Sequence, residues 1–144
     1  MSNSAFRPHG SADVLVQGQT MVVQLRGNWN AEMRTQAAQE MVQLVPALQA
    51  QGPWGIVNVM HDTLIYSESI YEQTRASYEN RSLQSRLCAV AFVIGAQVEG
   101  ASLLRPRFER LLDGIISSTV CPTLAEALDW VQAQVDAATR QQPP

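Results

Sequence analysis

The chain has 144 residues, of which 46% are hydrophobic and 16% are charged. This composition is that of one globular domain and excludes an intrinsically disordered chain. The formal net charge of −3 argues against a nucleic-acid partner, and the absence of lysine excludes Schiff-base chemistry and a P-loop lysine. No apolar stretch is long enough to span a membrane, so we expect a soluble, cytoplasmic protein.

The N-terminal part of the chain predicts an arm, a hairpin and a helix. The first twelve residues show no periodicity and predict a flexible arm. Two short β-type runs, 14–16 and 21–25, flank Gly18 and predict a β-hairpin. Over residues 31–51 apolar side chains recur at helical spacing, and Pro46 should kink this helix or end its regular part.

The central stretch predicts where a functional site should lie. The apolar, largely β-branched sequence of residues 56–60 predicts a buried parallel strand. A polar turn follows this strand and begins at His61. Ser67 can then cap a helix that begins at Glu68. Open α/β sheets usually place their sites in such loops, at the carboxyl ends of central strands.

The helix predicted over residues 68–86 is only weakly amphipathic. Tyr71 and Tyr78 are seven residues apart and share one stripe of this helix. The stripe either packs the helix onto the sheet or belongs to a lightly anchored helix that serves as a mobile lid or a partner-binding face.

The C-terminal half continues the alternation of strands and helices. Residues 87–94 are apolar throughout and predict a strand covered on both faces. Apolar residues from Leu104 to Leu112 predict the next helix, and Pro106 is compatible with this helix only if it lies in the first turn. Residues 115–121 predict a last strand at an edge or exposed face, and Thr123 forms a capping box with Glu126 at the start of the last helix.

The predicted order is therefore ββαβαβαβα, an α/β fold. It requires a mostly parallel five-stranded sheet with an antiparallel first strand, covered by four helices. We expect one domain over residues 13–138, preceded by the arm of residues 1–12 and followed by a frayed tail of residues 139–144.

The central stretch resembles the SpoIIAA-like (STAS) superfamily, whose centre reads as an apolar strand, a linker, an apolar pair and Asp-Ser-Ser-Gly. Residues 56–59 correspond to the strand and residues 64–70 to the motif, with Tyr66 and Ser69 in place of Asp and Gly. Ser67 falls on the serine that is phosphorylated in the anti-sigma-factor antagonists of this family. The resemblance implies a protein-interaction switch with Ser67 as its phosphorylation site.

Residues 120–131 resemble a second branch, the stand-alone bacterial SpoIIAA-like proteins likened to CRAL-TRIO lipid carriers. This resemblance, which extends over about residues 12–136, implies a non-enzymatic carrier or sensor of a small apolar or amphiphilic ligand. Some members approach membranes through a mobile helix, which implies peripheral membrane contact. The ligand would lie under the helix of residues 68–86, with an arginine at the mouth. The candidate ligand-binding residues are Ile65, Tyr66, Ile70, Tyr71, Leu104, Arg105, Arg107 and Phe108.

Catalysis and metal binding find less support in the residues. His61, Asp62 and Ser67 form the only compact set for a hydrolase, but adjacent side chains in an extended turn diverge. The two histidines and two cysteines lack a short metal-ligand spacing, so we expect neither a metal nor a cofactor. Arg107 can also belong to an ordinary solvated face with Glu109 and Asp113 as partners.

Two hypotheses remain, a carrier or sensor of a small ligand and, as the alternative, the switch at Ser67. The first predicts a ligand and membrane contact, and the second predicts a protein partner. The sequence is also compatible with a homodimer.

Overall fold

The computed structural model describes residues 11–26, 31–61, 68–82, 86–98 and 100–141. Five strands and four helices alternate along these residues in the predicted order. The strands are β1 (Ser11–Gln17), β2 (Thr20–Arg26), β3 (Trp54–Met60), β4 (Leu87–Ile94) and β5 (Ser117–Cys121). The helices are α1 (Ala31–Gln51), α2 (Glu68–Ser82), α3 (Ala101–Leu111) and α4 (Leu124–Arg140).

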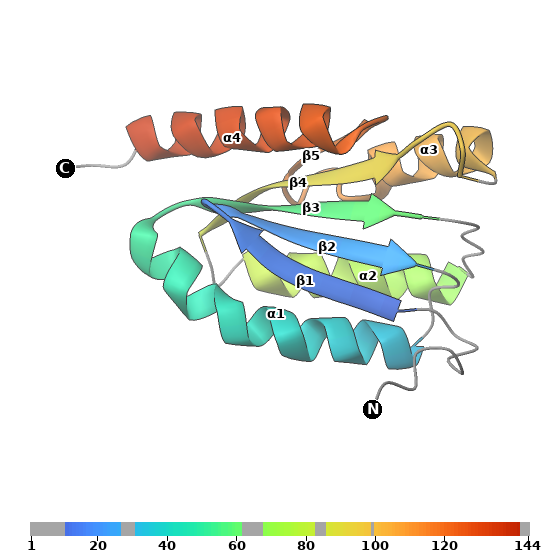
Figure 1. Ribbon diagram of the computed structural model, residues 1–144, viewed down its shortest axis with the longest axis horizontal. Coiled ribbons are helices and arrows are strands. Elements are labelled where there is room, and N and C mark those ends of the chain that lie inside the picture. Colours follow the sequence, from blue (N-terminus) through green and yellow to red (C-terminus); the bar gives the residue numbers. More distant parts are fainter. Residues whose placement is uncertain (1–10, 27–30, 62–67, 83–85, 99, 142–144) are drawn as a thin grey trace.

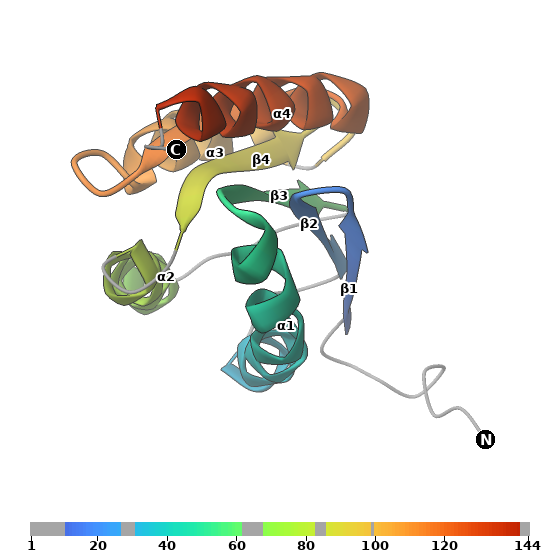
Figure 2. The ribbon, with the colours of Figure 1, turned by 90° about the vertical axis from the view of Figure 1, so that its left-hand side faces the viewer.

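The strands form one sheet in the order β1-β2-β3-β4-β5. β1 is antiparallel to β2, and the remaining neighbours are parallel, which confirms the predicted α/β class and mixed sheet. Helices α1 and α2 lie on one face of the sheet and α4 lies on the other (Figures 1 and 2). The carboxyl ends of β2, β3 and β4 therefore meet at one end of the molecule, beside the N-terminal ends of α2 and α3 (Figure 1).

Alternation along the strands divides the apolar side chains between two cores. Ile56, Val90 and Phe92 face the larger core, which includes buried residues of α1, α2 and α3. Val57 and Ala91 face the smaller core, which α4 closes with Ala127, Val131 and Val135. Both faces of β3 and β4 are covered, as their continuous apolar sequences predict.

Two glycines fit the conformations that the fold requires of them. Gly18, in the turn between β1 and β2, has a φ of 63°, which glycine adopts without strain. Gly55, in β3, lies under α4, where an added Cβ would come within 2.4 Å of Val131 Cγ1. The close packing of α4 on the sheet therefore depends on the missing side chain at Gly55.

The structure differs from the sequence predictions mainly at element ends and at prolines. β1 begins at Ser11 and α4 ends at Arg140, two residues beyond the predicted domain bounds on each side. α1 continues through Pro46, as one of the two predicted outcomes allows, and changes direction in its last turns (Figure 1).

The prediction that Pro106 lies in a first turn was wrong, because Pro106 is the sixth residue of α3. Its missing N–H deprives the carbonyl of Ser102 of a helical hydrogen bond. Leu104 and Phe108 lie on either side of Pro106 and are both buried, so packing holds the helix across the missing bond.

Candidate functional site

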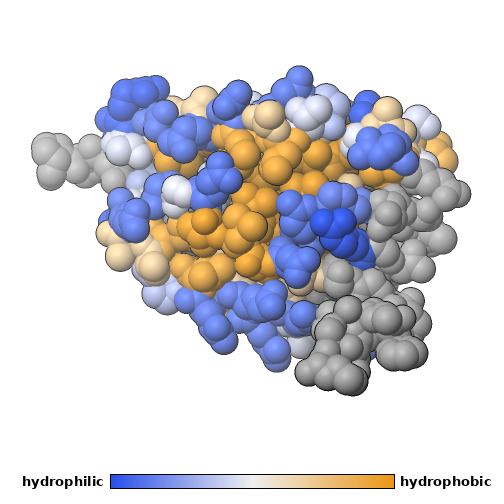
Figure 3. All heavy atoms as spheres, viewed as in Figure 1, coloured by the Kyte–Doolittle hydropathy of each residue, from blue (hydrophilic) through white to orange (hydrophobic). Residues whose placement is uncertain are grey.

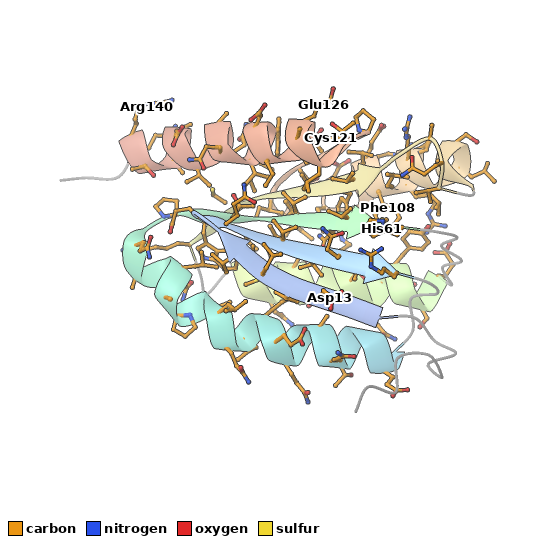
Figure 4. All side chains as sticks on the ribbon, in the orientation of Figure 1. Asp13, His61, Phe108, Cys121, Glu126 and Arg140 are labelled. Atoms are coloured by element: carbon orange, nitrogen blue, oxygen red, sulfur yellow. The ribbon has the colours of Figure 1, made fainter. Side chains whose placement is uncertain are left out.

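The candidate site lies at the end of the sheet where β3 and β4 finish. His61 follows β3, and Phe108 of α3 lies at the same end of the molecule (Figure 4). The His61 N–H donates to Leu25 O at 2.9 Å, and His61 Nε2 lies 2.5 Å from Gln24 Oε1. His61 thus joins the end of β3 to β2. Asp62 and Ser67 lie outside the described residues, so the expectation that this set does not form a hydrolase site stays a prediction.

An aromatic cluster occupies the space between α2, α3 and the sheet. The Phe108 ring lies 5.6 Å from the Tyr71 ring and 4.9 Å from the Phe92 ring, centroid to centroid. Tyr71, Leu104 and Phe108 are all buried. The structure therefore brings these three predicted ligand-binding residues together, and it places them in the larger core. Of the others, Ile65 and Tyr66 lie outside the described residues, and the side chain of Ile70 is likewise not among those described.

Arg107 connects α3 to the start of α2. Its guanidinium pairs with Glu68 through two hydrogen bonds, at 2.5 and 3.0 Å, and its Cζ lies 3.8 Å from the centroid of the Tyr71 ring. A two-bond arginine–carboxylate pair with a stacked ring has a defined geometry even at an exposed position. The expected partners Glu109 and Asp113 are therefore replaced by Glu68, from another helix.

Two further arginines of this region, Arg75 and Arg105, bind backbone carbonyl groups of neighbouring elements. Arg75 of α2 donates through Nη1 to Leu111 O at 2.7 Å and through Nη2 to Asp113 O at 3.1 Å. Arg105 donates to Ile94 O through Nε at 3.2 Å and Nη2 at 2.9 Å. Arg75 thereby fastens α2 to the end of α3, and Arg105 fastens α3 to the end of β4. Of the two arginines expected at a ligand mouth, Arg105 is engaged in this structural role.

The tyrosine stripe of α2 packs the helix onto the sheet. Tyr71 and Tyr78 are both buried, and Asn58 Nδ2 of β3 donates to the Tyr78 hydroxyl at 2.9 Å. This confirms the packing interpretation of the stripe. Asn58 and Tyr78 form a buried polar pair that sequence reasoning missed, although an Asn within an apolar strand was its visible signal.

The outer face of α3 carries an exposed apolar side chain between charges. Leu103 is 78% exposed, the largest exposed fraction among the described large hydrophobic residues. Arg107 and Arg110 follow it at helical spacing on the same face and are also exposed. We call Glu68, Leu103, Arg107 and Arg110 the α2–α3 surface.

The pairing of Glu68 predicts how its carboxyl titrates. The hydrogen bonds from Arg107 hold the pKa of Glu68 below its ordinary value of 4.5. A lowered folded pKa means that the pair stabilises the fold above pH 4.5 and loses this effect as the pH falls through the folded value. We expect an NMR titration to give a midpoint below 4.5 for Glu68, and Arg107→Gln to return it toward that value. An unchanged midpoint in Arg107→Gln would contradict the pairing.

The described residues also bear on metal binding and on membrane insertion. No group of three or more His, Cys, Asp or Glu side chains among them could hold a metal ion. In the same part of the chain, every helix is too short or too polar to cross a membrane.

Comparison with known proteins gives a match in structure. No family model and no curated protein sequence matches the chain. The fold is similar to the crystal structure of an anti-sigma factor antagonist from Mycobacterium paratuberculosis, with a TM-score of 0.50 and 21% identity. The match covers 88% of this chain and 97% of that chain. Together with the strand order and the single antiparallel strand β1, it shows that the chain has the SpoIIAA-like (STAS) fold.

Proposed function

We propose that the chain is a non-catalytic regulatory domain that binds a protein partner through the α2–α3 surface. The observation that carries the proposal is Leu103, an exposed leucine that shares one face of the short helix α3 with Arg107 and Arg110. Arginine is enriched at the energetic centres of protein interfaces, and a partner that covered the exposed Leu103 side chain would remove apolar surface from water. The structural neighbour is named for action on another protein factor, which supports the same class of function.

Charge on this surface indicates the kind of partner. Arg107 and Arg110 outnumber Glu68, and Arg107 is already oriented by its bonds to Glu68 and its position over Tyr71. A partner segment with acidic side chains around an apolar residue would complement this arrangement. Because Arg107 is held in place before binding, less side-chain entropy is lost in the complex.

The carrier hypothesis finds less support in the arrangement of its residues. A ligand under α2 would have to separate the Tyr71 and Phe108 rings, which are 5.6 Å apart. It would also have to displace a helix that Arg75, Tyr78 and Glu68 attach to its neighbours. The energetic cost of opening this packed region favours a binding site on its outside.

We also propose Ser67 as the modification site of the domain. Ser67 is the residue immediately before α2, which begins at Glu68. A phosphate at the start of a helix is favoured by the helix dipole, and it would compete with the Glu68 carboxylate for Arg107. Mass spectrometry of protein isolated from its host should show one phosphate that Ser67→Ala removes. Unmodified protein under all growth conditions would contradict this assignment.

The partner-binding surface is tested by affinity enrichment from host extract with three immobilised proteins. Leu103→Lys replaces the exposed anchor, and Val42→Lys makes the same change at a residue of α1 that is 62% exposed. We expect a protein that the wild type and Val42→Lys retain equally and that Leu103→Lys depletes by at least about tenfold, or 1.4 kcal/mol of binding energy. Equal retention by all three proteins would contradict the proposed surface.

A further inference from the structure

We infer that β1 is the interface of a homodimer, in which two copies of this edge strand pair antiparallel into one continuous sheet. β1 is the first strand of the sheet order, and its one sheet neighbour among the described strands is β2. This inference is independent of the proposed partner surface, which lies on other elements.

Three of the usual protections of an edge strand are absent from β1 itself. Edge strands are usually protected by charged side chains, especially lysine, by proline, or by a bulge that interrupts the pairing. Residues 11–17 contain neither lysine nor proline, and Asp13 is the one charged residue among them. All seven residues pair in unbroken register with β2, from Ser11 with Arg26 to Gln17 with Thr20. A regular strand of this length presents a continuous row of hydrogen-bonding groups to its surroundings.

The direction of these groups follows from the bonds on the other side of β2. Gly55 N–H donates to Gln19 O, and His61 N–H donates to Leu25 O, so the odd-numbered residues of this stretch bond to β3. The even-numbered residues of β2 therefore bond to β1, where their partners are the odd-numbered residues 13, 15 and 17. Residues 12, 14 and 16 of β1 consequently direct their N–H and C=O groups away from the sheet.

These outward groups match a second copy of the same strand. A two-fold axis at Val14 pairs Val14 with the partner's Val14 and Ala12 with the partner's Val16. Both kinds of pair join residues with outward groups, as an antiparallel hydrogen-bonded pair requires. The facing side chains are all apolar. Asp13 then lies opposite the partner's Leu15, so the two Asp13 carboxylates are not opposed.

Apolar surface surrounds the same edge. Leu15 and Val16 are 47% and 40% exposed, and they lie on opposite faces of β1 because side chains alternate along a strand. Figure 3 shows hydrophobic surface between α4 and α1 on the side of the molecule that carries β1. A paired second copy would cover apolar side chains on both faces of the strand, which supplies the favourable free energy of association.

The dimer leaves the candidate functional site accessible in both copies. The axis reverses the direction of the strands, so the carboxyl ends of β3 and β4 of the two copies point to opposite ends of the joined sheet. Partner binding and dimer formation can therefore be measured separately, and failure of one does not imply failure of the other.

Sedimentation velocity over a range of protein concentrations tests the dimer. We expect the wild type to approach twice the chain mass of 15.9 kDa. In Leu15→Asp, the new carboxylate of each copy would lie opposite the partner's Asp13 carboxylate. This repulsion should raise the dissociation constant of the dimer by at least about tenfold. The matched Leu15→Lys would face the same carboxylates with a positive charge and should remain dimeric. Leu103→Lys should leave the dimer unchanged.

Val14→Pro provides a second variant that acts on the backbone. Its N–H points outward, so proline removes a bond of the dimer and none of the β1–β2 pairing. Folding of each variant is confirmed by circular dichroism, and Leu15→Asp tests the interface without altering the backbone if Val14→Pro fails to fold. A single-chain mass for the wild type at all concentrations would overturn the inference. Equal dissociation constants for Leu15→Asp and Leu15→Lys, or an undiminished dimer in folded Val14→Pro, would also overturn it.

Discussion

Phe108→Ala should lower the free energy of unfolding by about 3–5 kcal/mol, the range found for phenylalanine truncation in packed cores. The Phe108 ring is buried between the Tyr71 and Phe92 rings, at centroid distances of 5.6 and 4.9 Å. Its removal loses the transfer free energy of the ring and leaves a cavity between α2, α3 and β4. Urea denaturation followed by circular dichroism measures the difference.

Phe108→Leu is the matched control, because leucine fills part of the same volume and should recover much of the loss. The measurement also separates the core and carrier interpretations of this cluster. A loss of less than about 1 kcal/mol in Phe108→Ala would be too small for a core phenylalanine. Such a small loss would indicate that the Phe108 ring lines a cavity, which would favour the carrier interpretation over the core interpretation.

Gly55→Ala should destabilise the protein by about 1–3 kcal/mol, the usual cost of overpacking a core. The added Cβ would lie 2.4 Å from Val131 Cγ1 and 3.1 Å from the carbonyl oxygen of Ala89. Val131 is buried and its β-branched side chain has few alternative rotamers, so α4 must shift on the sheet. Thermal unfolding of the variant and the wild type measures the effect.

The double variant Gly55→Ala with Val131→Ala tests whether this contact is the cause. Val131→Ala alone creates a small cavity and destabilises, but it also removes the methyl group that the new Cβ meets. We expect the double variant to be more stable than the sum of the two changes predicts, with a coupling of about 0.5–3 kcal/mol. Strictly additive effects would show that Gly55 is required for another reason.

The order and direction of the strands were predictable because each element is locally distinctive. Residues 87–94 are apolar throughout, which identifies a buried central strand, and the Gly18 turn identifies the one antiparallel pair. Thr123 also accepts a hydrogen bond from the Glu126 N–H, as its capping motif predicts. Pro106 was misplaced because burial of Leu104 and Phe108, a tertiary effect, stabilises α3 on both sides of the proline.

The candidate site was less predictable because its contacts join distant parts of the chain. The pairing of Arg107 with Glu68 links α3 to α2, whereas sequence reasoning considers partners three or four residues away. The bond between Asn58 and Tyr78 has the same origin. Leu103 could have been identified, since a helix that buries Leu104 and Phe108 turns position 103 away from the core.

Photo-cross-linking in the host tests the central claim, that the α2–α3 surface binds a protein. A photoreactive amino acid replaces Leu103 in one protein and Glu126, an exposed residue at the start of α4, in a control. We expect position 103 to give a cross-linked protein of one defined mass that is absent from position 126. A lipid adduct or no adduct at position 103, with the variant folded, would contradict a protein-binding role for this surface.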